Sequence, residues 1–401
     1  MRLRVDWLRF ARDASSSSDQ PCATRSARSR LRTRPSSSPS SCVIGKIVCL
    51  TRMTWLALPV NGPGIPRGPH EGNDLMLADE LVDETVDVVV IGGGAAGLNG
   101  ALMLARSRRS VLVIDSGAPR NAPADGVHGL LGLDGTPPAE LLARGRAEVR
   151  RYGGRIVNGE VVDARPGAPS DDGDLRFTVT LADGRSVRAR RLLVATGLRD
   201  VLPDVPGLAS HWGRGVVHCP YCHGWEVRDE PIGVLAVGPA SVHHALLFRQ
   251  LSDDLVYFVH GTELDADTTA RFTARGIRIV DTPVAEIVDG GDGIAGVRLT
   301  DGQFVARRVL AVATTLEVRA EGLAGLGLAI RDLPGGMGRH FASGTAGVTE
   351  VPGVWVAGNA ADPMAQVGAA AAAGALAGAH MNADLVGADT DAALRRGTAL
   401  V

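Results

Sequence analysis

The chain has 401 residues, and its 42 basic and 44 acidic residues leave a formal net charge of −2. This length suits two or three domains, and the near balance of charge argues against nucleic acid as a partner. Gly contributes 51 residues while aromatic residues make up 4%, which favours an α/β protein with tight phosphate-binding turns. The most apolar stretch, residues 365–379, is mostly Ala and Gly, so we expect a cytoplasmic protein with no membrane partner.

Residues 1–80 differ from the rest in composition, because they are rich in Arg and Ser and show no sustained helical or strand period. We interpret them as a disordered leader or as an artefact of an upstream start site, with the working protein beginning near Met76. An organelle transit peptide is the alternative. Three of the five cysteines, Cys22, Cys42 and Cys49, lie here. The odd total argues against a secreted disulfide framework.

A dinucleotide-binding unit is predicted at the start of the folded part. Residues 86–91 form a continuous β-branched run, typical of a buried parallel strand. The glycines Gly92, Gly94 and Gly97 follow, then a helical pattern over residues 98–107 and a strand ending at Asp115. In this arrangement the glycines permit the turn, the approach of the pyrophosphate and close helix packing, and the acid binds a ribose hydroxyl.

Two later segments favour FAD as the dinucleotide. Residues 193–197, which contain Thr196 and Gly197, resemble the Ala-Thr-Gly turn at which the FAD domains of two-dinucleotide flavoproteins return to the cofactor. Residues 354–359 resemble the late strand that places an acid near the ribityl chain, with Gly358 and Asn359 at its end. Gln366 opens an Ala-rich helix that we expect near the isoalloxazine, although a tightly packed core helix explains the Ala run equally well.

A second βαβ unit is predicted over residues 232–259, with a strand at 232–237, a helix at 242–251 and a strand at 255–259. Residues 155–191 and 277–312 are predicted as β meanders. We therefore expect an α/β fold with two Rossmann-like dinucleotide-binding domains, the second inserted into the first. The expected boundaries are 84–200 and 314–390 for the FAD domain, 201–313 for the inserted domain and 391–401 for a tail.

The pair Cys219 and Cys222 carries the predicted chemistry. Two cysteines three residues apart close a small disulfide ring, and only a thiolate attacks a disulfide sulfur. His218 and His223 flank the pair and offer an acid or base near neutral pH. A zinc half-site and an incidental pair are the alternatives, but zinc needs four ligands and no second Cys-x-x-Cys exists. We predict a redox pair and no metal.

These motifs and their order make residues 86–385 resemble the low-molecular-weight thioredoxin reductase family. The segment from Cys219 to Gly224 is most similar to the dithiol-oxidase branch, since classical reductases have Asp where His223 stands. The resemblance implies FAD, a homodimer and a second domain able to rotate. It also implies that Cys222 lies nearer the flavin, that Cys219 receives the substrate thiolate and that His223 acts as acid and base.

The second nucleotide turn departs from the family pattern. Ala236 stands where the first glycine is expected, and Pro239 follows Gly238. Residues 259–262 contain no Arg for the 2′-phosphate of NADPH, which needs a cationic partner. Arg249 or Arg271 is the candidate substitute. NADPH binding is therefore an open question in the sequence.

We predict an FAD-dependent thiol-disulfide oxidoreductase that favours dithiol oxidation with oxygen as acceptor. The substrate is a dithiol or disulfide, either a small molecule or a thioredoxin-like protein. An NADPH-dependent thioredoxin reductase uses the same residues with the opposite electron flow. A non-catalytic flavin redox sensor is the third hypothesis for the function.

Overall fold

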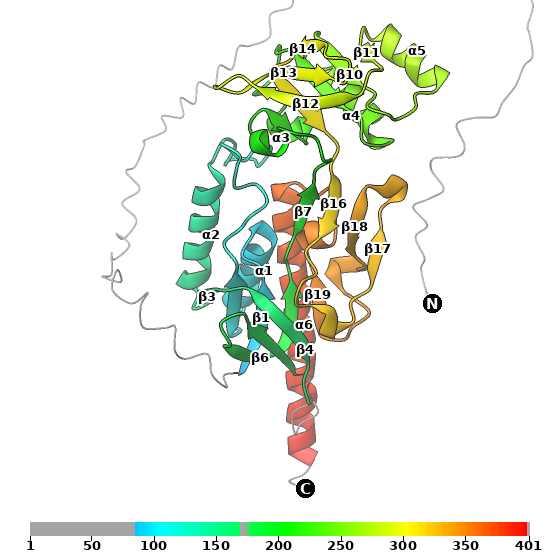
Figure 1. The fold of residues 1–401 in the computed structure, drawn as a ribbon. Coiled ribbons are helices and arrows are strands. Elements are labelled where there is room, and N and C mark those ends of the chain that lie inside the picture. Colours follow the sequence, from blue (N-terminus) through cyan, green and yellow to red (C-terminus); the bar gives the residue numbers. More distant parts are fainter. Residues whose placement is uncertain (1–84, 169–173, 175, 399–401) are drawn as a thin grey trace, which may run out of the picture. The chain divides into compact units, whose positions relative to one another are not determined.

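A computed structural model describes residues 85–168, 174 and 176–398 (Figure 1). The interpretation of residues 1–80 as a leader, with its three cysteines, lies outside the described residues. So do the final three residues of the predicted tail.

The first sheet contains the predicted glycine-rich unit. Its strands follow the order β3-β2-β1-β6-β5-β4, and β19 pairs with β6. The strands β1, β2, β3, β6 and β19 run parallel, whereas β4 and β5 are antiparallel to their neighbours. The bounds are β1 Thr85–Ile91, β2 Val111–Asp115, β3 Arg155–Asn158, β4 Val161–Pro166, β5 Phe177–Leu181, β6 Ser186–Val194 and β19 Val354–Val356.

The second sheet has the order β11-β10-β9-β15-β8, and all of its pairings are parallel. Its strands are β8 Val216–Val217, β9 Ile232–Leu235, β10 Leu255–Phe258, β11 Arg278–Val280 and β15 Val309–Val312. The helices α4 Ala240–Phe248 and α5 Ala266–Ala274 follow β9 and β10. An antiparallel sheet of β12 Val284–Asp289, β13 Ile294–Leu299 and β14 Phe304–Ala306 lies between β11 and β15 in the chain. The two Rossmann-like units are confirmed.

The predicted meanders are partly wrong. The strand β3 pairs in parallel with β2, so only β4, β5 and β6 form the first meander. Likewise β11 and β15 belong to the parallel sheet, which leaves β12 to β14 as the second meander. All four residues of β15 are buried, which is the pattern of a central parallel strand and not of a meander strand with one face in water.

Two antiparallel strands, β7 Leu198–Val201 and β16 Thr315–Val318, lie where the chain leaves the first unit and where it returns to it. They extend into a four-stranded sheet with β18 Gly338–Phe341 and β17 Ile330–Asp332. Short 3₁₀ turns occur at Ala209–His211, Ala324–Leu326, Pro334–Gly336, Thr345–Gly347 and Gly358–Ala360.

The remaining helices are α1 Ala95–Arg106, α2 Pro138–Arg151, α3 Pro220–His223 and α6 Val367–Thr398. The small residues of α6 let it lie directly against α1, since a Cβ on Gly374 would stand 1.9 Å from the carbonyl oxygen of Ala96. This contact explains the Ala- and Gly-rich sequence. None of the described helices combines the length and apolar character that a membrane crossing requires.

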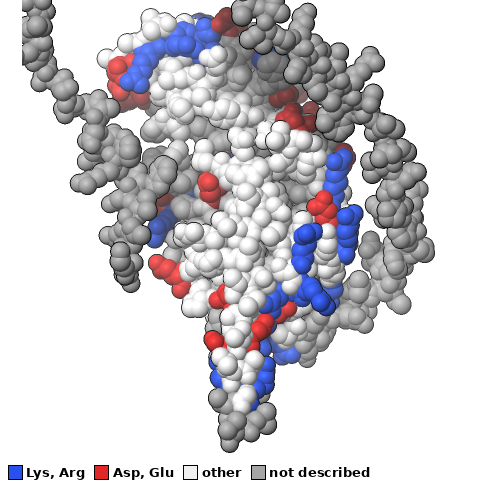
Figure 2. Space-filling view, turned by 180° about the vertical axis from the view of Figure 1, so that it is seen from behind, with Lys and Arg blue, Asp and Glu red and all other residues white. Residues whose placement is uncertain are grey.

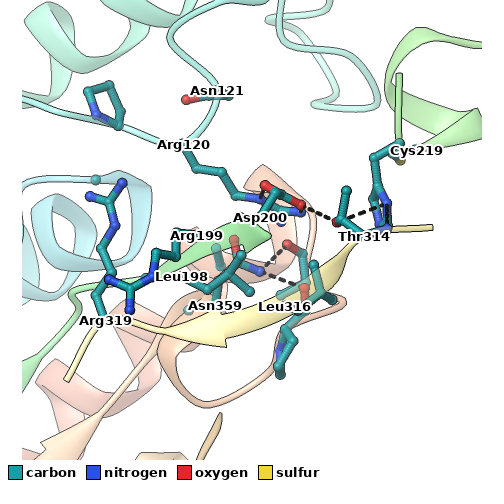
Figure 3. A pocket seen from close by; sticks show the side chains of 18 of the residues that line it. Arg120, Asn121, Leu198, Arg199, Asp200, Cys219, Thr314, Leu316, Arg319 and Asn359 are labelled. Carbon is teal, nitrogen blue, oxygen red and sulfur yellow. Dashed lines mark hydrogen bonds and ion pairs between the residues drawn. The ribbon is translucent and has the colours of Figure 1, made fainter. Parts of the chain in front are cut away.

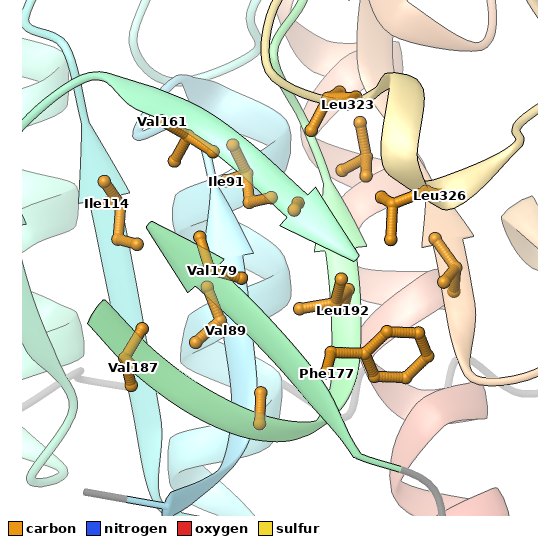
Figure 4. Packing of buried hydrophobic residues seen from close by; sticks show 14 of the residues in the cluster. Val89, Ile91, Ile114, Val161, Phe177, Val179, Val187, Leu192, Leu323 and Leu326 are labelled. Carbon is orange, nitrogen blue, oxygen red and sulfur yellow. The ribbon is translucent and has the colours of Figure 1, made fainter. Parts of the chain in front are cut away.

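The central strands of the first sheet are buried on both faces, which explains why residues 88–91 form an unbroken apolar run. On one side, side chains of the parallel strands pack against Phe177 and Val179 of β5, the antiparallel part of the same sheet (Figure 4). The other face packs against α1 and α6 through residues such as Leu98 and Met381. Each large apolar side chain fully buried there contributes about 1.5–3 kcal/mol. The sheet therefore holds the ends of β1, β2 and β6 in fixed positions beside the site.

Candidate active site

The turn between β1 and α1 gives each predicted glycine a distinct position. Gly92 has a φ of +109°, and a Cβ there would lie 2.3 Å from the carbonyl oxygen of Ala195. A Cβ on Gly97 would lie 1.9 Å from the carbonyl oxygen of Gly92. A Cβ on Gly94 would meet no atom within 4 Å, and this glycine faces a cavity. The turn therefore leaves open space where a phosphate approaches the amides at the start of α1.

Asp115 lies at the end of β2 beside this turn, and 8% of it is exposed. Its carboxylate accepts a hydrogen bond from Arg146 of α2 at 2.9 Å and one from the Gly117 N–H at 3.2 Å. A Cβ on Gly93 would stand 2.5 Å from the same carboxylate. Arg146, which sequence reasoning missed, fixes the orientation of the acid that is predicted to bind a ribose.

The later predicted segments line the same cavity. Thr196 and Gly197 follow β6, and the Thr196 hydroxyl donates to the carbonyl of Arg319 at 2.7 Å. Gly358 and Gln366 also face the cavity. The amide nitrogen of Asn359 donates to the carbonyls of residues 362, 363 and 365, at 3.1, 3.2 and 2.8 Å. The nitrogen thus shapes its own loop, and the side-chain oxygen is the atom left to accept from a ligand hydroxyl.

One cavity of about 1180 Å³ joins this turn to the cysteine pair. Its walls include every predicted site residue except Gly97, whose place is in the packing of α1 against β1. The volume exceeds the roughly 300–1,000 Å³ typical of sites for small ligands. The glycine turn, the positioned acid and the open space fit a dinucleotide such as FAD, with room beside it for a further group.

Cys219 and Cys222 form a disulfide with a Cα–Cα distance of 5.2 Å. Pro220 begins α3 directly after Cys219, where its missing N–H costs nothing. The backbone of Gly224 ends this short helix against Leu251, because a Cβ there would lie 2.3 Å from the Leu251 side chain. The described residues contain no cluster of three His, Cys, Asp or Glu side chains arranged to hold a metal ion.

His223 lies at the end of α3 with both ring nitrogens buried and without a hydrogen-bond partner among the described residues. Burial lowers the pKa of His223 below its usual value, so the ring is neutral at pH 7. His128, from the loop after β2, stands 3.5 Å from Glu226. A buried polar atom without a partner costs about 1–3 kcal/mol. The His223 nitrogens are therefore available to a group that enters the cavity.

A second polar group lies on the Cys219 side and was missed in the sequence, because its members are distant along the chain. Arg120 donates two hydrogen bonds to Asp200, at 2.6 and 2.7 Å. Thr314 donates to Asp200 at 2.6 Å and lies 3.4 Å from Nδ1 of His218. Figure 3 shows this chain running from Arg120 toward Cys219. Only His218 of this group stood out in the sequence, as a flank of the cysteine pair.

The second nucleotide turn fits a pyridine nucleotide poorly. Pro239 has no N–H, and the N–H of Val237 donates to the buried Ser241 hydroxyl at 3.0 Å. At the end of β10, His260 accepts the N–H of Val284 at Nδ1, and burial lowers the pKa of His260. The ring is thus a neutral acceptor and not a cation for a 2′-phosphate.

The two arginines suggested as substitutes are already paired. Arg249 binds Asp253 and the carbonyl of Arg275. Arg271 forms an ion pair with Asp267 at 2.7 Å on α5. Neither arginine supplies a free cation to the turn in this arrangement.

Comparison with known proteins places these features in a family. Residues 86–374 match the family described as pyridine nucleotide-disulphide oxidoreductase. The chain is 32% identical over 320 residues to thioredoxin reductase sirT of Leptosphaeria maculans, covering 76% of this chain and 95% of that one. It is 38% identical over 251 residues to thioredoxin reductase tcpT of Claviceps purpurea, covering 60% of this chain and 77% of that one.

Solved structures agree with these relatives. The structure of HlmI is 45% identical, with a TM-score of 0.74, and the match covers 79% of this chain and 97% of HlmI. An oxidoreductase from Agrobacterium tumefaciens is 36% identical with a TM-score of 0.70, covering 75% of this chain and 99% of that one. With the disulfide and the glycine turn on one cavity, the chain belongs to the pyridine nucleotide-disulphide oxidoreductase family, as a thioredoxin reductase-like, FAD-dependent disulfide oxidoreductase.

Proposed function

We propose that the enzyme oxidises a dithiol substrate, with oxygen as the final electron acceptor. The observation that carries this proposal is the contrast between the two nucleotide turns. Both turns line the cavity that holds the disulfide, but they offer a ligand different groups. The first leaves open space beside Gly94, whereas at the second Pro239 has no N–H and the N–H of Val237 is taken up by the Ser241 hydroxyl. A chain with a poor site for NADPH needs another electron source, and a dithiol is the source that its disulfide can accept.

The proposed roles follow the positions of the side chains. A substrate thiolate attacks Cys219, which forms a mixed disulfide and releases Cys222 as a thiolate. The second substrate thiol then displaces Cys219, so the substrate leaves as a disulfide and the two cysteines hold the electron pair. His223, neutral at pH 7, takes the proton of the second thiol. When bound, FAD would supply the acceptor for the electron pair of the reduced cysteines and the route from them to oxygen.

The cofactor contacts are proposed from the same cavity. Gly92 and Gly94 admit the pyrophosphate, and Asp115 holds a ribose hydroxyl. Asn359 accepts from the ribityl chain through its side-chain oxygen. The other contacts assigned to the bound flavin are Thr196, Gly197, Gly358 and Gln366.

We also propose that the enzyme is a homodimer that works in the cytoplasm. One face of α6 supports the dimer, because Ala369, Ala372, Leu376, Ala383 and Leu394 are all exposed there at helical spacing. Leu376 and Leu394 are 55% and 64% exposed. Figure 2 shows few charged side chains along the strip that ends in the last turns of α6. Such an uncharged helix face suits contact with a second copy.

The dimer is tested by placing a charge on that face. Leu376→Glu should shift the protein from dimer to monomer in analytical ultracentrifugation, because the carboxylate would be buried without a partner. Ala393→Glu, at an exposed position on another side of α6, is the matched control. A dimer that survives Leu376→Glu would place the contact elsewhere, and a monomeric wild-type protein would end the proposal.

The direction of electron flow is tested anaerobically. The flavin absorbance of the purified protein is followed after adding NADPH, and separately after adding dithiothreitol. We expect bleaching by dithiothreitol and none by NADPH, with recovery and one peroxide per flavin when air is admitted. Rapid bleaching by NADPH would instead favour a thioredoxin reductase. A single reduction without turnover in air would favour a redox sensor.

A further inference from the structure

We propose that His218 is a second proton acceptor in the active site, dedicated to Cys219, and that Asp200 and Thr314 position its ring. The inference rests on the proposed function, because it assigns the proton of the first substrate thiol. His218 is the residue before Cys219 and lines the same cavity as the disulfide. His223 is assigned to the second substrate thiol, so each substrate thiol has its own imidazole.

The contacts of the ring determine its tautomer. Nδ1 of His218 lies 3.0 Å from the carbonyl oxygen of Val312. The N–H of Thr314 also points at Nδ1 from 3.4 Å, but the contact with the carbonyl is shorter and a carbonyl oxygen only accepts hydrogen bonds, so we assign the proton to Nδ1. The lone pair of the neutral ring is therefore on Nε2, on the opposite side from Val312. Nε2 is the atom that can take a proton.

A chain of donors leads from His218 back to a buried carboxylate. The Thr314 hydroxyl donates to Asp200 at 2.6 Å, which leaves its oxygen free to accept the longer branch, at 3.4 Å, of the hydrogen bond that the His218 Nδ1–H shares with Val312. A hydroxyl that donates to a carboxylate becomes a better acceptor. Thr314 is 5% exposed and so is the Asp200 side chain. The negative charge of Asp200 thus acts on the ring through one hydroxyl, out of contact with water.

Asp200 is held ionised. Its burial by itself would raise its pKa, but the hydrogen bonds and charge of Arg120 keep the pKa of this carboxyl below its usual value. The charge of Arg120 lowers the pKa of His218 by at least as much as the charge of Asp200 raises it, so Asp200 acts on the ring mainly by positioning it through Thr314. This pairing explains why a buried carboxylate is tolerated beside strands β7 and β16.

The other groups around His218 are also accounted for. His244 on α4 donates its Nε2–H to the carbonyl of His218, which fixes the backbone before Cys219. Burial lowers the pKa of His244 to about 4 and lowers that of His218, so both rings are neutral at pH 7. His223 is the remaining titratable neighbour. A neutral His218 is the form that accepts a proton.

The exchange balances with these groups alone. The first substrate thiol gives its proton to Nε2 of His218, and its sulfur bonds to Cys219 as the Cys219–Cys222 bond breaks. The second thiol gives its proton to His223 and attacks the first substrate sulfur. Cys219 leaves as a thiolate and takes the proton from His218. The substrate is oxidised to a disulfide, and the enzyme is reduced to one thiol and one thiolate.

The test compares His218→Gln with wild-type enzyme in anaerobic bleaching of the flavin by dithiothreitol between pH 6 and 9. Loss of a general base lowers the rate about 100-fold, while the FAD content is unchanged. The matched control, His340→Gln on β18 outside the cavity, keeps the wild-type rate. A His218→Gln rate within twofold of wild type, with an unchanged pH profile, would overturn the inference.

A second readout does not use the flavin. In a Cys222→Ser background, the pH dependence of iodoacetamide alkylation gives the pKa of Cys219. His218→Gln should raise this pKa, because the imidazole can take up the proton that Cys219 loses, and the resulting ion pair stabilises the thiolate. An unchanged pKa of Cys219 would count against the contact that the proposal requires.

Thr314→Val tests the positioning chain even if His218→Gln misfolds. Without the hydroxyl, protonated His218 loses its link to Asp200, so the rate profile shifts about half a pH unit or more toward acid. A purely structural role would lower stability without moving the profile, and that result would overturn the role of Thr314. If dithiothreitol fails to bleach even the wild-type enzyme, the proposed function fails before this inference is reached.

Discussion

The three glycines of the first turn should respond differently to the same added methyl group. Gly94→Ala places a Cβ where no protein atom lies within 4 Å, and the backbone there has an ordinary extended conformation with φ −77°. The loss of a favourable N-cap residue costs about 0.5–1 kcal/mol, and the reduced entropy of the unfolded chain offsets about 0.4–1 kcal/mol. The free energy of unfolding of the FAD-free protein should therefore stay within about 1 kcal/mol of wild type.

The same substitution should weaken FAD binding, because the methyl group fills the space that we assign to the pyrophosphate. The loss of two charge-assisted hydrogen bonds, each about 1.5 kcal/mol, corresponds to about a 100-fold increase in Kd. Gly97→Ala should instead lower the stability of the FAD-free protein. Its Cβ would stand 1.9 Å from the carbonyl oxygen of Gly92, so backbone must move and the protein loses about 3 kcal/mol or more.

Two measurements separate these outcomes. Urea unfolding of the FAD-free variants gives their stability, and fluorescence titration of the same proteins with FAD gives the Kd. Wild-type affinity in Gly94→Ala would refute the placement of the pyrophosphate at this turn. Wild-type stability in Gly97→Ala would refute the packing argument for α1 against β1.

Three further predictions follow from single side chains. Cys222→Ser should abolish dithiol turnover while the purified protein keeps its FAD; turnover measured by peroxide release would contradict the assignment. Asn359→Asp should destabilise the protein by about 3 kcal/mol in urea unfolding, because a carboxylate would face three carbonyl oxygens. Burial by itself would raise the pKa of Asp174, but hydrogen bonds from Arg191 and Arg190 hold it at about 2. Its contribution is thus complete above about pH 4 and lost as pH falls toward 2, so the stability advantage of wild type over Asp174→Asn should shrink between urea titrations at pH 6 and pH 3.

The sequence predicted those parts of the fold that depend on local pattern. The run at residues 86–91 and the glycines after it identify a buried strand and a phosphate turn, because both are set by neighbours along the chain. The strands β3 and β15 were misassigned to meanders for the opposite reason. Whether a short apolar strand pairs in parallel or antiparallel is decided by distant partners, which are β2 and β9 here.

In the site as well, features set by neighbours along the chain were predicted and features set by distant residues were not. The spacing of Cys219 and Cys222 predicts a redox pair, and the distance of Asp115 from the glycines along the chain predicts a ribose-binding acid. The partners that orient them are not predicted in this way, since Arg146 is 31 residues from Asp115 and Thr314 is 96 residues from His218. An Arg or Thr in a sequence carries no signal of which carboxylate or ring it will meet. Only the folded chain shows these contacts.

The split between local and distant signals also explains how one fold supports opposite electron flows. The disulfide and the first turn are local motifs, and they are compatible with either direction. The direction of electron flow depends on whether the second turn accepts a nucleotide. In this chain Pro239 and the Ser241 hydroxyl lie at the pyrophosphate turn, and the neutral His260 lies at the end of β10, where a cation for a 2′-phosphate is expected. Substituting these few residues leaves the parallel sheet of β8 to β11 and β15 in place. On the proposal made above, the second unit has given up nucleotide binding and still carries the disulfide, because Pro239, Ser241 and His260 are not among the apolar residues that form its core.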